Sequence, residues 1–191
     1  MERDKTHSRC VLGEVNMNQN TISLKIALQE EAKKISALVN SVYRGENSKK
    51  GWTTEADFLS GIRITEEKVM EMIGRKNDLI ILAIIDGEIT GCVHLENAGS
   101  YSYLGMLSVD VNLQDKGIGR ILINECERIT KHDWKLDEIK MKVISRRNEL
   151  IEYYNRRGYA ATGEIEEFGA QGDTFGDTGE ELWFVTLAKK L

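Results

Sequence analysis

The sequence is poor in the residues that divide or cross-link a chain. Its 191 residues include no proline and only three cysteines and three histidines. No Pro/Gly/Ser-rich linker, internal repeat or low-complexity tract marks a boundary, and a chain of this length can bury a sizeable core. We therefore expect a single domain over 21–191, preceded by a flexible N-terminal tail over 1–20.

The few cysteines and histidines argue against cross-links and metal sites. The cysteines are Cys10, Cys92 and Cys126. An odd number at scattered positions suggests neither a disulfide framework nor a paired-cysteine zinc site. The histidines are His7, His94 and His132. They are too scattered for a local zinc signature, so we expect no bound metal, and reduced thiols that fit a cytoplasmic protein.

Long apolar runs and long basic runs are also missing. No segment is apolar for the length of a signal peptide or a membrane span, which predicts a soluble, cytoplasmic protein. The net charge is -5 and the pI about 5.4, without a long run of Lys or Arg. This balance argues against a nucleic-acid partner, so any anion must be bound by a local group of basic residues.

Hydrophobic periodicity predicts an α/β fold with a mixed sheet. Asp86-Gly87 supplies the positive φ angles of a tight hairpin turn. The strands are expected at 21–28, 78–85, 88–96, 101–111, 138–144, 161–166 and 181–187. The helices are expected around 35–42, after a cap at Thr53 or Thr54, around 69–73, from Gly117 onward, and at 148–157 before Gly158.

The strongest motif is a glycine turn between a predicted strand and a predicted helix, with the sequence Gln114-Asp115-Lys116-Gly117-Ile118-Gly119. The start of a helix presents unpaired N–H groups and the positive end of the helix dipole, which together bind phosphate. The two glycines let the backbone approach a bulky anion, and Lys116 and Arg120 add positive charge. Gln114 can tie the turn together.

The spacing of this turn disfavours two other phosphate-binding motifs. A dinucleotide fingerprint needs a third glycine where the sequence has Leu122, and a P-loop needs a Gly-Lys-Ser/Thr ending that is missing. An ordinary strand-to-helix turn, with glycines that only ease the chain reversal, remains the simplest alternative.

Two motifs in order resemble the GNAT superfamily of N-acetyltransferases. Gln114, Gly117 and Gly119 match the family's turn for the pyrophosphate of acetyl-CoA, and Asn148 to Tyr159 is similar to its helix with a late tyrosine. The resemblance covers roughly 21–191. It implies a mixed, mostly antiparallel central sheet flanked by helices, with a splayed central strand, and acetyl-CoA as co-substrate.

The resemblance also implies how the donor is held. The central strand would splay at Leu107 to Val109, so that the Leu107 N–H faces the acetyl carbonyl and Val109 holds the pantetheine arm. Residues 114–120 would bind the pyrophosphate. Asn148 can bond the pantetheine amides, or simply cap its helix.

A second set of roles concerns proton transfer. Tyr154 matches the tyrosine that stands beside the sulfur and protonates the leaving thiolate, although Tyr153 and Tyr154 could instead be a packed aromatic pair. Tyr103 stands where some members carry a glutamate base, which leaves Glu96 as substitute, His94 as a further candidate, or solvent alone. Cys92 and Cys126 could form an acetyl-enzyme, but both lie in apolar patterns, so direct transfer is simpler.

The acceptor amine is not encoded in a readable motif. We expect the loops at 43–52 and 168–179 to wall its site. Acidic residues could attract a cationic amine, or could form a solvated face: Glu164, Glu166, Glu167, Asp173, Asp177, Glu180 and Glu181. Amino acids, polyamines, aminoglycosides and protein or peptide amines all stay open. The rival hypotheses are an inactive acyl-CoA sensor of the same fold and a nucleotide-binding enzyme. A homodimer is possible.

Overall fold

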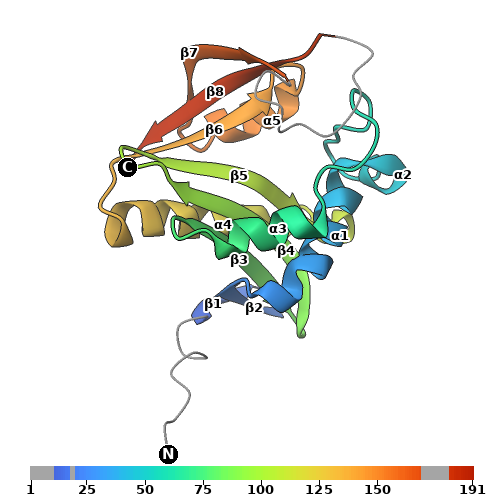
Figure 1. Ribbon diagram of the computed structural model, residues 1–191, viewed down its shortest axis with the longest axis vertical. Coiled ribbons are helices and arrows are strands. Elements are labelled where there is room, and N and C mark those ends of the chain that lie inside the picture. The colour runs from blue at the N-terminus through green and yellow to red at the C-terminus, as the bar shows by residue number, and fades with distance from the viewer. Residues whose placement is uncertain (1–10, 18–19, 169–180) are drawn as a thin grey trace, which may run out of the picture.

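A computed structural model describes residues 11–17, 20–168 and 181–191, and its centre is one eight-stranded sheet (Figure 1). The strand order is β1-β2-β3-β4-β5-β6-β8-β7, and only the β5–β6 pair is parallel among the described pairs. The expected mixed, mostly antiparallel sheet is therefore confirmed. The strands are β1 (Val11–Met17), β2 (Asn20–Ile26), β3 (Asp78–Ile85), β4 (Glu88–Asn97), β5 (Ser102–Val109), β6 (Glu138–Ile144), β7 (Ala160–Glu167) and β8 (Trp183–Lys190).

Helices cover both faces of this sheet (Figure 1). They are α1 (Ala32–Tyr43), α2 (Gly45–Ser48), α3 (Glu66–Gly74), α4 (Ile118–Arg128) and α5 (Asn148–Asn155). Short 3-10 turns are η2 (Gln29–Glu31) and η3 (Val111–Leu113), and a π-helical turn η4 (Ile129–Asp133) extends α4.

The apolar strand β3 is buried on both faces and joins two cores. Ile80 and Leu82 pack with residues of α1 and α3, whereas Ile81 and Ala83 pack with residues of α4 on the opposite face. Side chains alternate along a strand, so a continuous apolar run serves both layers. Burial of each large aliphatic side chain contributes about 1.5–3 kcal/mol, so β3 is a strong anchor for the sheet.

The hairpin between β3 and β4 forms as the sequence predicts. Asp86 has a φ of 51° and Gly87 a φ of 81°, the left-handed values that a type I′ turn needs. This hairpin brings β4 beside β3 and thereby sets the position of β5.

The sheet divides between β5 and β6. Their parallel pairing is limited to Ser102 with Ile139 and Tyr103 with Lys140. On its other edge, β6 pairs with β8 along its whole length. Figure 1 shows β6, β8 and β7 diverging from β5. The expected splay is present, but it begins directly after Tyr103 rather than at Leu107. A register shift opposite β4 and a left-handed Met106, with a φ of 54°, mark a bulge there.

Two expectations for the first third of the chain are wrong. The presumed tail contains β1, which pairs antiparallel with β2, for example Glu14 with Ser23. This edge strand has only seven residues in an otherwise polar stretch, although its Leu12 and Val15 pack against the core. In the described residues no helix begins at Thr53 or Thr54; Thr54 Oγ1 instead accepts the Ala56 N–H at 3.0 Å in a turn.

Across the described ranges, no helix is both long and apolar enough to cross a membrane.

Candidate active site

The glycine turn opens onto a cavity of about 600 Å³, here named the turn cavity. The end of β5, the start of α4 and the last turns of α5 form its walls. Ten of the eleven residues expected to bind cofactor line it: Leu107, Val109, Gln114, Asp115, Lys116, Gly117, Ile118, Gly119, Arg120 and Tyr154. A strand end, a turn and a later helix, which are separate in the sequence, thus surround one cavity.

The backbone of the turn leaves room for an anion at the start of α4. Gly117 caps the helix in the left-handed conformation, with a φ of 79°, and Asp115 before it has a φ of 62°. A Cβ at Gly119 would lie only 3.3 Å from Tyr153 Oη and 3.7 Å from Val109 Cγ2. A larger residue there would fill the approach to the helix N–H groups, which is the reason the position suits glycine.

Positive charge is concentrated in the turn cavity although the whole chain is acidic. The side chains that line it include one carboxylate, Asp115, and five cations: Lys116, Arg120, Arg147, Arg156 and Arg157. Such an excess suits a ligand with several phosphate charges.

Two aromatic rings also line the turn cavity, Trp52 of the 43–52 loop and Tyr153 of α5. Trp52 and Tyr153 stack with centroids 5.4 Å apart, and the Arg157 guanidinium lies 3.4 Å from the Tyr153 ring centroid. Arg157 also donates a hydrogen bond to the Tyr153 carbonyl at 2.8 Å. The sequence predicts Tyr153 only as the possible packing partner of Tyr154, whereas in the structure it lines this cavity.

Gln114 ties the turn together as expected, and it also fastens a distant loop. Its Oε1 accepts the Trp52 N–H at 3.1 Å, and its Nε2 donates to the Val109 carbonyl at 3.4 Å. The loop around Gly51 is thereby held against the end of β5.

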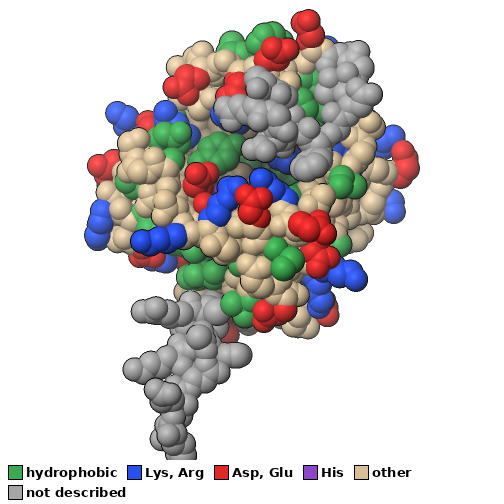
Figure 2. All heavy atoms as spheres, in the orientation of Figure 1, with side chains coloured by type: hydrophobic (Ala, Val, Ile, Leu, Met, Phe, Trp, Pro, Cys, Tyr) green, Lys and Arg blue, Asp and Glu red, His purple; other side chains and the backbone are tan. Residues whose placement is uncertain are grey.

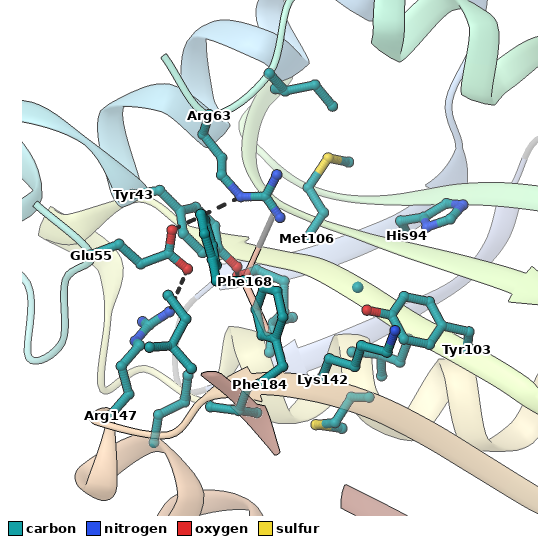
Figure 3. Close-up of a pocket in the computed structure, with 18 of the residues that line it drawn as sticks. Tyr43, Glu55, Arg63, His94, Tyr103, Met106, Lys142, Arg147, Phe168 and Phe184 are labelled. Atoms are coloured by element: carbon teal, nitrogen blue, oxygen red, sulfur yellow. Dashed lines mark hydrogen bonds and ion pairs between the residues drawn. The ribbon is translucent and has the colours of Figure 1, made fainter. Parts of the chain in front are cut away.

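A second cavity of about 280 Å³ lies further back along β5, beside residues 103–107, and is here named the aromatic cavity (Figure 3). Figure 2 shows a hollow in the molecule, with charged side chains of both signs at its rim and hydrophobic side chains within. The two cavities adjoin, because the same residues line both: Tyr43, Leu107, Arg147, Leu150 and Tyr154.

Tyr43 fixes the wall between the two cavities. Its hydroxyl donates a hydrogen bond to the Leu107 carbonyl at 2.9 Å. Burial, followed by the nearby Glu55 carboxylate, raises the pKa of Tyr43 to about 12, so the hydroxyl keeps its proton and stays a donor. No local motif predicts this contact, because it joins the end of α1 to a strand sixty-four residues later.

Tyr154 stands at the junction of the two cavities. It is 4% exposed, and its ring packs edge-on against Tyr153 and Tyr159 at 5.3 and 5.8 Å. Burial raises the pKa of Tyr154 far above its usual value of 10.0, so the phenol stays protonated at neutral pH and can donate its proton. The two adjacent tyrosines therefore have different surroundings.

Two candidates for the general base lie on β4, the Glu96 carboxylate and the His94 imidazole, and only His94 lines a cavity. His94 is buried in the aromatic cavity, and its Nε2 lies 3.1 Å from Asp78 Oδ2. Burial lowers the pKa of His94, although Asp78 acts in the opposite direction. Glu96 is half-buried opposite Tyr103 and lines neither cavity, so the expectation that it stands at the reaction centre has no support in the geometry.

Several other candidates lie outside both cavities. Asn148 is exposed in the first turn of α5 and does not line the turn cavity. It is also not the cap, a position held by Arg147. Cys92 and Cys126 are fully buried, and burial raises the pKa of both thiols, that of Cys92 to about 12. Neither is a thiolate nucleophile at neutral pH, which agrees with their assignment to the core.

The acidic residues near the C-terminus do not form an acidic acceptor wall in the described part of the chain. Glu166 alone lines the aromatic cavity, and it is paired with Lys142. Glu164 lies 3.9 Å from Lys140. Asp173, Asp177 and Glu180 lie outside the described residues, as does the expected loop wall beyond Phe168. Of the other expected loop, Tyr43 and Arg44 line the aromatic cavity and Trp52 the turn cavity. No group of three potential metal ligands is found in the described ranges.

Taken together, these features describe an α/β protein with a cation-rich cavity at a helix start, beside a second cavity that shares part of its lining. Residues 44–172 match the family model for the acetyltransferase (GNAT) domain. The chain therefore belongs to the GNAT acetyltransferase family and is an acyltransferase.

Solved structures of this family have the same fold at low sequence identity. A GNAT-family acetyltransferase from Streptococcus pneumoniae is 19% identical with a TM-score of 0.64, over 89% of this chain and 99% of its own. The PaiA N-acetyltransferase from Thermoplasma acidophilum, in complex with coenzyme A, is 19% identical with a TM-score of 0.62, over 89% and 99%. The spermidine/spermine N-acetyltransferase SpeG from Vibrio cholerae is 15% identical with a TM-score of 0.64, over 92% and 95%. No curated protein sequence matches this chain.

Proposed function

We propose that this protein transfers the acetyl group of acetyl-CoA to the primary amine of a small molecule or peptide by direct attack. The observation that carries the proposal is the junction of the two cavities at Leu107 and Tyr154. A donor in the turn cavity and an amine in the aromatic cavity would meet there without a covalent enzyme intermediate. Direct attack needs this proximity, which can lower a barrier by several kcal/mol.

The turn cavity has the shape and charge that acetyl-CoA requires. The N–H groups from Gly117 to Arg120 and the basic side chains around them would hold the pyrophosphate. The splay after Tyr103 leaves one edge of β5 open toward β6, and a pantetheine arm can pair with such an edge as a strand does. The complex of the Thermoplasma acidophilum relative with coenzyme A agrees with this use of the fold.

The proposed reaction forms one C–N bond and breaks one C–S bond. The neutral amine attacks the thioester carbonyl, and the Leu107 N–H stabilises the negative charge that develops on the carbonyl oxygen. As the C–S bond breaks, Tyr154 gives its proton to the thiolate. The amine gives up one proton, and Tyr154 takes one up again from solvent before the next turnover, so the products are an N-acetyl amide and free CoA thiol.

We infer that His94 receives the amine proton, through water where the acceptor does not reach it. An ionised Asp78 can only accept a hydrogen bond, so a neutral His94 donates from Nε2 and keeps Nδ1 unprotonated. Gly105 has no side chain to cover that nitrogen, since a Cβ there would lie 3.8 Å from it. The low pKa of the buried imidazole keeps it in the neutral, basic form at pH 7.

Substitution of His94 is expected to change how kcat/KM decreases at low pH. His94→Gln should lower kcat/KM about tenfold, because solvent partly replaces the base. In the wild type, activity should fall only below pH 6.5, the ordinary pKa of histidine, because burial lowers the value in the folded protein. Glu96→Gln is the matched control and should change the profile little. An unaltered acid limb in His94→Gln would contradict the role.

The same shift predicts a change of stability with pH. Below pH 6.5 the unfolded chain takes up the His94 proton more readily than the folded one, so the free energy of unfolding should decrease as pH falls below that value. Urea titrations at a series of pH values should show this dependence reduced in His94→Gln.

Thiol release from acetyl-CoA in the presence of a panel of primary amines tests the function. Amine-dependent release of CoA, with the N-acetyl product found by mass spectrometry, would support the proposal. Tight binding of acetyl-CoA without turnover on any amine would instead favour an acyl-CoA sensor.

A further inference from the structure

The aromatic cavity carries more positive than negative charge. Two carboxylates and five cations line it: Glu55, Glu166, Arg44, Arg63, Lys68, Lys142 and Arg147. An acceptor whose only charge is a protonated amine would be repelled by this excess. The charge points to an acceptor that brings a negative group of its own.

Neither carboxylate of the lining is open to a cationic acceptor. Glu55 is buried and bonds Arg44 as well as Arg147, the latter at 3.0 Å, and Arg63 Nε lies 4.0 Å away (Figure 3). Glu166 bonds Lys142. Each carboxylate already has a cationic partner, and one carboxylate cannot neutralise three guanidinium groups.

Arg63 is the cation best placed to bind an anion. Figure 3 shows its guanidinium reaching into the cavity between Tyr43 and Met106. Its nearest carboxylate within the described residues is Glu55, at the limit of an ion pair. Its side chain is 33% exposed, so a ligand can reach it from the cavity.

The backbone that carries Arg63 is held in place from α1. Asn40 Oδ1 accepts the N–H groups of Arg63 at 2.6 Å and Ile64 at 3.1 Å, and Asn40 Nδ2 donates to the Ile64 carbonyl at 2.8 Å. The guanidinium also lies over the Tyr43 ring, 5.6 Å from its centroid. Arg63 is therefore part of a built site rather than a loose surface cation.

The position of Arg63 limits the distance between the anion and the reacting amine. Its guanidinium lies on one face of the Tyr43 ring, and the hydroxyl of that ring bonds the Leu107 carbonyl at the cavity junction. A single tyrosine side chain thus separates the anion site from the acetyl site. This distance suits a small molecule whose negative group lies a few bonds from its amine.

We propose that the acceptor is an α-amino acid or a close analogue, whose carboxylate binds Arg63 and whose side chain is apolar. Apolar side chains form another part of the lining and could receive such a side chain: Leu104, Met106, Met141, Phe168 and Phe184. This inference rests on the proposed function, because it names the acceptor of the same reaction.

Matched amines with and without a carboxylate test the proposal. CoA release would be measured with phenylalanine and phenethylamine, with leucine and isoamylamine, and with the two amino acid amides. The carboxylate member of each pair should have a kcat/KM at least ~10-fold higher, as loss of a charge-assisted bond predicts. Equal or better use of the amines without a carboxylate would overturn the proposal.

Variants assign the preference to Arg63. Arg63→Gln should lower kcat/KM for phenylalanine much more than for phenethylamine, so that the preference for the carboxylate is lost, and Arg63→Lys should keep part of it. Lys68→Gln is the control, since this lysine of the same lining is 3.2 Å from Glu71, and it should keep the preference. A loss of activity in Arg63→Gln that is equal for both members of a pair would contradict a carboxylate site.

Binding measurements separate this proposal from the proposed reaction. Calorimetry with phenylalanine and with N-acetylphenylalanine, in the presence of CoA, would be compared between wild type and Arg63→Gln. Binding that is lost only in the variant supports the anion site even if no amine is acetylated. Absence of binding to the wild type would refute it even if other amines are acetylated.

Discussion

Replacement of Gly119 by aspartate is expected to raise the KM for acetyl-CoA by about two orders of magnitude without loss of stability. The new side chain would meet Tyr153 Oη and Val109, and its charge would repel the pyrophosphate at the N–H groups of α4. Loss of one or two charge-assisted hydrogen bonds, each contributing about 1.5–3 kcal/mol, accounts for this magnitude. Near a helix start, an acidic residue is favourable to the helix itself.

Two measurements separate loss of the anion site from damage to the fold. The melting temperature of Gly119→Asp should equal or exceed that of the wild type, while calorimetry should detect little binding of acetyl-CoA. Gly119→Ala is the matched variant, and its Cβ at 3.3 Å from a hydroxyl should give a much smaller effect. Normal acetyl-CoA affinity in Gly119→Asp would show that the donor binds elsewhere.

Tyr154→Phe is expected to lower kcat by about 10²-fold or more with little change in the KM for acetyl-CoA. The substitution removes the proton offered to the leaving thiolate but keeps the ring that fills the cavity junction. Burial keeps the phenol of Tyr154 protonated, so this loss should be the same across the neutral pH range. Steady-state kinetics from pH 6 to 9 would check both statements.

The neighbouring tyrosine supplies the control for this substitution. Tyr153 faces the turn cavity and its Oη lies beside Gly119, so Tyr153→Phe should raise the KM for acetyl-CoA a few-fold and leave kcat nearly unchanged. If both variants have the same kinetic defect, Tyr154 is a packing residue and not the acid.

The features predicted well from the sequence are those encoded by local chain geometry. Asp86-Gly87 specifies its hairpin because few other residues adopt two successive left-handed conformations. The turn before α4 is similarly local, since Gly117, the helix start and the basic side chains are within a few residues of one another. Tyr154 was found through its place in a second local motif.

Tyr43 and Trp52 lie in the loop that was expected to wall the acceptor site, but their individual contacts, and the place of Arg63, depend on tertiary packing. Tyr43 and Arg63 belong to α1 and a loop after it, and they line the site only because α1 crosses the end of β5. Their side chains in the sequence look like any aromatic and any surface arginine. Trp52 likewise reaches the turn cavity through a bond from its backbone to Gln114.

Two further errors come from side-chain direction. His94 and Glu96 alternate on β4 and share a face, yet the aromatic cavity ends before Glu96, where Tyr103 of β5 lines it instead. Asn148 precedes Tyr154 on α5 but its first helical turn points to solvent. Neither difference can be read from periodicity, because strand and helix periods give the face and not the extent of a cavity.

The loop from Gly51 to Glu55 contacts the walls of both cavities. Its Trp52 N–H donates to Gln114 of the glycine turn, and its Thr53 and Glu55 side chains accept hydrogen bonds from Arg147, which lines both cavities. A ligand that ordered this segment from one side would lower the entropic cost of binding on the other. By reciprocity, donor and acceptor would then increase each other's affinity by the same factor, so the apparent affinity for one reactant would depend on the concentration of the other.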